Sequence, residues 1–173
     1  MASDLKSPQY GGGGGTPFDD SSFIGSPITA ITVGHGDLVD SIQITYGTQQ
    51  GPRHGGGGGR VDTISLAKGE QVIAVVGRSG ASTDQIQFVT VSGNVLKSYG
   101  PYGGNGGNPF YIIGAVDAFF GRSGDLLDAV GVWVKPPVMV SAESGSFDLR
   151  AARYGGPKPT VAREASEGAC SSS

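Results

Sequence analysis

The sequence predicts an all-β domain built from a repeated unit, and three observations lead to this fold class. Short segments such as 28–33 alternate apolar and polar residues, which is typical of half-buried strands. No segment carries an apolar stripe with the period of a helix. A glycine followed four residues later by an aspartate recurs at positions 36, 80 and 124, and this constant spacing of 44 residues indicates three internal repeats.

The expected strands follow one another in a similar order in each unit. A first edge strand is expected over 5–10, because proline is tolerated on an edge. The strands expected in the first unit are 28–33 and 42–46; in the second, 63–66, 71–76, 85–91 and 95–99; in the third, 110–113, 116–120 and 129–134. Ile42, Ile44 and Tyr46 should face the core, and Ser92-Gly93-Asn94 predicts a hairpin turn. Three such units favour three small sheets packed around one core.

Glycine runs share the repeat and indicate a binding function. They occupy 11–15, 55–59 and, interrupted by Asn105, 103–107. Bare backbone lets a flat ligand come close, and an aspartate beside backbone amides can accept hydrogen bonds from hydroxyl groups. Such a mixture of donors and acceptors suits adjacent sugar hydroxyls. A single Gly-x-x-x-Asp motif is usually an ordinary turn, but three copies in register with three glycine runs favour sugar binding.

Composition and charge argue against several other classes. The net charge of −3 gives no basic surface for nucleic acid. Cys170 is the sole cysteine, so neither a disulfide framework nor a thiolate metal site is expected. His35 and His54 lack partners at metal-ligand spacing and are predicted to be surface or loop histidines. No loop has the alternating oxygen ligands of a calcium site, so neither metal nor cofactor is expected.

The sequence also gives an expectation for where the protein resides. Met1–Lys6 contains no apolar run that could act as a signal peptide, and no stretch approaches the length of a membrane span. A soluble cytoplasmic protein without membrane insertion is therefore expected, with non-classical export left open.

Catalysis is not expected. A glycosidase needs two carboxylates flanking the scissile bond, whereas Asp37 and Asp40 leave the same short loop and point to the same side. The middle loop lacks the first aspartate altogether. No glycine run leads into the lysine of a nucleotide-binding loop, and no Gly-x-Ser-x-Gly elbow is present. We therefore predict a protein with no enzymatic activity and no catalytic residues.

Four stretches resemble the jacalin-related lectins, most closely their mannose-binding branch. They are Tyr10–Asp19 with the first glycine run, Arg53–Gly59, Tyr99–Gly103 and Phe119–Val132. The resemblance implies a β-prism I of three four-stranded Greek-key sheets with pseudo-threefold symmetry. It also implies reversible carbohydrate binding without catalysis. On this basis, residues 1–137 are the lectin domain and 138–173 are a Gly/Pro/Ser/Ala-rich C-terminal extension.

The same resemblance implies up to three sugar sites, each between the Gly-x-x-x-Asp loop of one unit and the glycine run of the next. The residues implied are Asp125, Leu126 and Asp128 with Gly15; Asp37, Leu38 and Asp40 with Gly59; and Ala81, Ser82 and Asp84 with Gly107. The closing aspartate takes sugar hydroxyls on its side chain, and the residues after the leading glycine give mainly backbone amides. Ala81 departs from the pattern, which puts the strength of the middle site in doubt.

The resemblance extends to the sugar. In this family, galactose binding accompanies cleavage that frees an amino group at the first glycine run. Here Met1–Tyr10 precede that run, and Leu38 and Leu126 are plain aliphatic residues, as in the mannose and glucose binders. The expected partners are therefore mannose- or glucose-containing glycans and glycoproteins.

An alternative from a different class remains open at this point. The β-prism could serve as an interaction or assembly module whose C-terminal extension docks a protein partner. The sequence also leaves open a homodimer or higher homo-oligomer.

Overall fold

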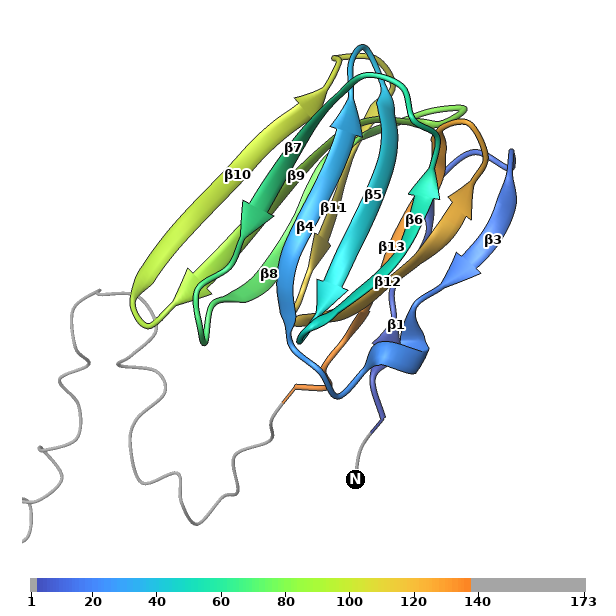
Figure 1. Cartoon of the computed structure of the whole chain (residues 1–173). Coiled ribbons are helices and arrows are strands. Elements are labelled where there is room, and N and C mark those ends of the chain that lie inside the picture. The colour runs from blue at the N-terminus through green and yellow to red at the C-terminus, as the bar shows by residue number, and fades with distance from the viewer. Residues whose placement is uncertain (1–2, 138–173) are drawn as a thin grey trace, which may run out of the picture. The chain divides into compact units, whose positions relative to one another are not determined.

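The alternating segments on either side of the first Gly-x-x-x-Asp loop form the central hairpin of the first sheet. In the computed structural model, which describes residues 3–137, this sheet contains β4 (Ile28–His35), β5 (Val39–Tyr46), β6 (Gln49–Gly55) and β7 (Arg60–Ser65). Ile42, Ile44 and Tyr46 are at most 1% exposed, which confirms that this face of β5 lies in the core. The strand order β6-β5-β4-β7 returns the fourth strand beside the first, as in a Greek key (Figure 1).

The second sheet repeats this plan. Its strands are β8 (Gln71–Ser79), β9 (Thr83–Ser92), β10 (Val95–Gly103) and β11 (Asn108–Ile113), in the order β10-β9-β8-β11. Gly93 has a φ of 61°, which glycine adopts without steric cost, and it sits in the tight turn between β9 and β10. The predicted hairpin at 92–94 is therefore confirmed.

The third sheet joins the two ends of the described chain. Its strands are β12 (Val116–Ser123) and β13 (Leu127–Val134) together with β1 (Leu5–Lys6), β2 (Tyr10–Gly11) and β3 (Thr16–Asp19). β3 pairs with β12, while β1 and β2 pair with the same edge of β13. The edge strand expected over 5–10 is thus present in two pieces, and at the interruption Ser7 Oγ accepts the Val132 N–H. Counting β1 and β2 as one interrupted edge, each sheet has four strands.

The structure corrects the division into units. Residues 63–66 and 110–113, expected to open the second and third units, instead pair as β7 and β11 with strands of the preceding sheet. The reason is that each glycine run links two strands of one sheet and does not separate sheets. Two edge strands, β3 and β6, were not expected, because each contains a proline, β6 also contains glycines, and neither alternates apolar and polar residues.

One hydrophobic core fills the space between the three sheets. Each sheet sends its inward-facing side chains into the same cluster, represented by Ile31 from the first sheet, Phe88 from the second and Phe119 from the third. The Phe88 and Phe119 rings meet edge to face with centroids 6.2 Å apart, a favoured arrangement for aromatic pairs. The predicted all-β fold with three sheets around a shared core is confirmed.

Helical structure is minor in the described part of the chain. Residues 3–137 contain a single 3₁₀ turn, η1 (Ser21–Phe23), and no α-helix. Accordingly, no helix in this range has the length and apolarity to cross a membrane. The compact unit that contains the sheets ends at Pro136. The predicted C-terminal extension, 138–173, lies outside the described residues.

Candidate functional site

Each sheet brings one Gly-x-x-x-Asp loop beside one glycine run. In the first sheet the loop joins β4 to β5 and the run joins β6 to β7; in the second, β8–β9 and β10–β11; in the third, β12–β13 and β2–β3. These links lie at one end of the prism, the upper end in Figure 1. The three pairs of predicted site segments therefore come together, and each pair belongs to a single sheet.

The three loops share one backbone conformation. In each, the amide of the leading glycine donates to the carbonyl oxygen two residues later: Gly36 to Leu38 at 2.9 Å, Gly80 to Ser82 at 2.9 Å and Gly124 to Leu126 at 3.0 Å. The residue before the closing aspartate anchors the loop in the core, and Val39, Thr83 and Leu127 are all fully buried. The loop is thus held from within and presents its remaining residues outward.

The closing aspartates lie against the last two glycines of their runs. A Cβ atom placed on Gly59 would be 2.6 Å from Oδ2 of Asp40, and one on Gly58 would be 2.8 Å from Oδ1. The corresponding distances are 2.5 and 2.7 Å between Gly107, Gly106 and Asp84, and 2.6 Å for both oxygens between Gly15, Gly14 and Asp128. A carboxylate therefore fills the space of two absent side chains in each sheet.

The last glycine of each run is required for a second reason. Gly15, Gly59 and Gly107 have φ values of 66°, 72° and 70°, a region that disfavours side chains. Within residues 3–137, the carboxylates of Asp40, Asp84 and Asp128 accept no hydrogen bond from the protein, and all three are partly exposed. Each site thus offers a free carboxylate beside bare backbone, a combination suited to binding hydroxyl groups.

The loops and runs form a closed ring around the end of the prism. The second glycine of each run packs against the first loop residue of a neighbouring sheet. A Cβ atom would lie 2.1 Å from the carbonyl oxygen of Ala81 if placed on Gly12, and 2.4 Å from those of Asp125 and Asp37 if placed on Gly56 and Gly104. Each contact is made by backbone, so Ala81 serves as well as the aspartates at this position. The side chains of Asp37 and Asp125 point to solvent, while Leu38, Ser82 and Leu126 are half-buried.

Two arginines that were not predicted as site residues hold two of the glycine runs. Arg122 donates from Nε and Nη2 to the carbonyl oxygens of Gly14 and Gly15 at 2.9 and 2.8 Å. Arg78 does the same for Gly106 and Gly107 at 3.0 and 2.7 Å. The signal in the sequence was the tetrapeptide Gly-Arg-Ser-Gly, which appears twice at the repeat spacing.

The prediction that His35 and His54 are surface or loop histidines is wrong, because each is only 7% exposed and lies in a strand. His54 Nε2 is 2.8 Å from Asp20 Oδ1, and its ring stacks on Phe18 with centroids 3.7 Å apart. His35 Nε2 is 2.6 Å from Asp62 Oδ2. A buried polar ring is tolerated when it is hydrogen-bonded, and here each ring meets a carboxylate from a distant part of the sequence.

These contacts also shift the ionisation of their neighbours. The hydrogen bond from His35 lowers the pKa of Asp62. Tyr46 donates to Asp20 Oδ2 at 2.9 Å inside the core, and burial, reinforced by the Asp20 charge, raises the pKa of Tyr46 well above its ordinary value. The two histidines directly precede Gly36 and Gly55 in the chain.

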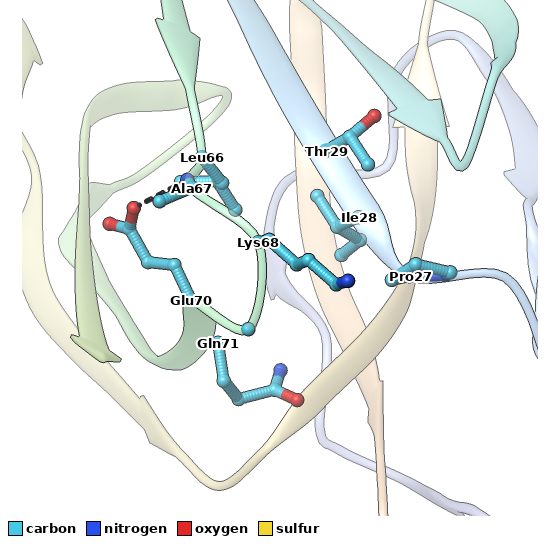
Figure 2. Close-up of a pocket in the computed structure, with 9 residues that line it drawn as sticks. Pro27, Ile28, Thr29, Leu66, Ala67, Lys68, Glu70 and Gln71 are labelled. Atoms are coloured by element: carbon cyan, nitrogen blue, oxygen red, sulfur yellow. Dashed lines mark hydrogen bonds between the residues drawn. The ribbon is translucent and has the colours of Figure 1, made fainter. Parts of the chain in front are cut away.

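The other end of the prism holds a cavity with a different character. It has a volume of about 400 Å³ and is lined by 27–29 and 66–71, at the opposite end of β4 from the loops (Figure 2). Its buried carboxylate, Glu70, accepts hydrogen bonds from the Ala67 amide, Thr90 Oγ1 and Tyr99 Oη at 2.8, 2.6 and 2.7 Å. The acid is thus occupied in holding the β7–β8 link. Across residues 3–137, no cluster of three or more His, Cys, Asp or Glu side chains could hold a metal ion.

Three Greek-key sheets around one core, with aspartate loops and glycine runs gathered at one end, define a β-prism of the lectin class. The family model of the Jacalin-like lectin domain matches residues 7–133, and the chain belongs to this family of carbohydrate-binding proteins. The resemblance inferred from the motifs and the expected β-prism I fold are thereby confirmed.

Solved structures of related lectins share the fold. A mannose-binding jacalin-related lectin from Ananas comosus is 30% identical, with 79% of this chain and 100% of that chain covered and a TM-score of 0.70. A mannose-specific jacalin-related lectin from Morus nigra, in complex with mannose, is 29% identical over 79% and 97% of the two chains, with a TM-score of 0.67. The wild-type lectin of Malaysian banana is 28% identical over 78% and 99%, with a TM-score of 0.68.

Proposed function

We propose that this chain is a lectin that binds mannose- or glucose-type glycans reversibly through three sites, without catalysis. Each site consists of a closing aspartate, the amides of its loop and the last glycine of the adjacent run. The main support is the threefold recurrence of a carboxylate beside bare glycine backbone, with nearly equal distances at all three positions. The similarity to a mannose-binding and a mannose-specific jacalin-related lectin supports the choice of sugar.

The geometry favours binding over bond cleavage. Hydrolysis of a glycoside needs two carboxyl groups on either side of the scissile bond. In the middle loop only Asp84 is present, because Ala81 stands at the first acidic position. The first-position aspartates Asp37 and Asp125 turn their carbonyl oxygens toward a neighbouring glycine run and their side chains toward solvent. A single carboxylate beside backbone donors can hold a sugar by hydrogen bonds, but it lacks the second carboxyl group that acid–base catalysis of hydrolysis needs.

Affinity at one site should be weak and should grow through multivalency. A shallow site with a few hydrogen bonds is expected to have a Kd of about 1 mM, equivalent to about −4 kcal/mol. Three sites on one rigid end of the prism can engage a branched glycan together and gain on the order of 10²- to 10⁴-fold where the branch spacing permits.

The test is a ¹⁵N NMR titration with methyl mannoside, with methyl galactoside as the specificity control. The amides of Gly15, Gly59 and Gly107 report the three sites separately. Asp40→Asn keeps the shape of the side chain but replaces an acceptor oxygen with a donor amide and removes the charge. We expect it to abolish the shift at Gly59 alone, and the equivalent Asp84 and Asp128 variants to act on their own sites.

A matched control comes from the ring of backbone contacts. Asp37→Ala copies the middle loop and removes a solvent-exposed carboxylate that makes no contact in the ring, so the first site should survive it. If the Gly107 amide does not respond to methyl mannoside while the other two do, the protein has two sites and the middle loop is structural. If none of the three amides responds, the proposed function is wrong.

A further inference from the structure

The three sheets differ at one position of equivalent register. On β8 and β12 this position is an arginine, and on β4 it is a glycine. The cross-strand partners are Gln85 and Pro109 for Arg78, Ala129 and Pro17 for Arg122, and Ser41 and Val61 for Gly34. Because the arginines hold the runs of their own sheets, the 55–59 run of the first sheet lacks this support.

The position left by the missing arginine is a small pocket. Its volume is about 150 Å³, and it is lined by the two cross-strand partners of Gly34 and by residues around them: Thr32, Ser41, Gln43, Arg53, Gly58 and Val61. The carbonyl oxygens of Gly58 and Gly59 correspond to those that accept arginine N–H groups in the other sheets. Among the described residues, neither accepts a side-chain hydrogen bond.

The pocket presents both donors and acceptors. Arg53 makes no hydrogen bond or ion pair within residues 3–137, so its guanidinium is free to donate. Gln43 donates from Nε2 to the Gly51 carbonyl oxygen at 2.8 Å, which leaves its amide oxygen as an acceptor. Val61 is 65% exposed and forms an aliphatic rim. A neutral polyhydroxyl group matches this set, because each hydroxyl both donates and accepts.

The pocket adjoins the first candidate sugar site. A Cβ atom on Gly58 would lie 2.8 Å from Oδ1 of Asp40, while Gly58 itself lines the pocket. Because the run is made of glycines, only its backbone, without side chains, lies between the Asp40 carboxylate and the pocket. A glycan that passes over this run can therefore reach both.

We propose that this pocket is a second sugar subsite that belongs to the Asp37–Asp40 site and to no other. It takes the neighbouring ring of a glycan whose first ring lies at Asp40 and Gly59. This inference rests on the proposed function. Its consequence is that the first site prefers an α-linked disaccharide to a monosaccharide, whereas the sites whose pockets are filled by Arg78 and Arg122 do not.

The experiment compares methyl mannoside with the α-linked mannobioses in the same NMR titration. At the Gly59 amide at least one mannobiose should bind about five-fold more tightly than methyl mannoside, the effect of roughly one net hydrogen bond. At Gly15 and Gly107 the two ligands should differ by no more than about two-fold, which is the statistical gain from two equivalent rings.

Two variants test the pocket itself. Arg53→Ala removes an exposed donor without affecting the core, and it should abolish the disaccharide gain at Gly59. Gly34→Arg fills the pocket; because its Cβ would lie 2.7 Å from Ser41 Oγ, it is paired with Ser41→Ala, which copies the Arg122 and Ala129 pair of the third sheet. Arg53→Ala should leave the methyl mannoside Kd at Gly59 within about two-fold, since it does not touch the first ring. The Gly34→Arg and Ser41→Ala double variant should remove the disaccharide gain, so that methyl mannoside and mannobiose bind at Gly59 with Kd values within about two-fold of each other, even if the new arginine also steadies the run and tightens both.

The outcomes separate the two proposals. A disaccharide gain that is equal at all three amides, or that survives in both variants, overturns the subsite while leaving the lectin function intact. The subsite is equally overturned if Arg53→Ala weakens methyl mannoside and mannobiose by the same factor, because the residue would then act on the first ring. If methyl mannoside shifts none of the three amides, the proposed function fails and the subsite fails with it.

Discussion

Thr83→Val should stabilise the protein, because the middle loop buries a hydroxyl group where the other two loops bury hydrocarbon. Thr83 is fully buried, and no described residue forms a hydrogen bond with its Oγ1. The equivalent residues, Val39 and Leu127, are also fully buried. A buried hydroxyl without a partner costs about 1–3 kcal/mol, and valine has nearly the same shape as threonine. We therefore expect the substitution to raise the free energy of unfolding by about 1–2 kcal/mol.

The assay is urea-induced unfolding, supported by thermal unfolding. For a domain of this size, a gain of that magnitude corresponds to an increase in Tm of about 3–8 °C. The matched control is Val39→Thr, which introduces the same hydroxyl into the first loop and should lower stability by about 1–3 kcal/mol. If Thr83→Val leaves stability unchanged or lowers it, the hydroxyl is hydrogen-bonded in the native protein and this reasoning is refuted.

Four further predictions concern an arginine that holds a glycine run, two buried polar groups and the expected absence of a metal. Arg122→Ala should lower the stability to urea by no more than about 1 kcal/mol, because the guanidinium is exposed, yet should weaken methyl mannoside binding at Gly15 several-fold; equal binding there would show that the run keeps its shape unaided. Tyr46→Phe should cost about 1.5–3 kcal/mol in urea unfolding, because it removes a hydrogen bond to the buried Asp20 carboxylate, without affecting sugar binding. Burial opposes ionisation of Glu70, but hydrogen bonds outweigh it and lower its pKa. Its stabilising effect is therefore present above the ordinary glutamate pKa and is lost as pH falls through the lower folded value, so Glu70→Gln should flatten the acid limb of the stability profile. EDTA should leave sugar affinity unchanged, and a loss that calcium restores would contradict a metal-free site.

Most of the fold could be predicted because the signals that indicate its strands, the alternation of apolar and polar residues, lie within each strand's own sequence. Strands that alternate, such as those around Ile42 and Phe88, carry their burial pattern in their own sequence. The edge strand β6 does not, because Gln49–Gly55 contains a proline and two glycines and shows no apolar alternation. Its position depends on pairing with β5. The pairing of loops with runs came from the family resemblance and could not have been obtained from spacing.

Predictions about single side chains failed where the partner is distant. His54 is polar and precedes a glycine run, which suggests exposure, but Asp20 and Phe18 from the start of the chain enclose it. The arginine bonds to the glycine runs were missed for a similar reason, because Arg122 meets Gly15 across 107 residues. Periodicity predicts which face of a strand is buried, and it carries no information on which segment covers that face.

The closure of the third sheet by both ends of the described chain has a consequence for the order of folding. The arginine bond to the last glycine of the run spans 29 residues in the second sheet and 107 in the third. This is nearly two doublings of loop length, which adds about 1 kcal/mol of loop-closure entropy. The first and second sheets can therefore assemble from local hairpins while the chain is still being synthesised, whereas the third must wait for β13. The Gly15 and Asp128 site should be the last of the three to form, and in a refolding experiment its amides should be the last to gain protection from hydrogen exchange.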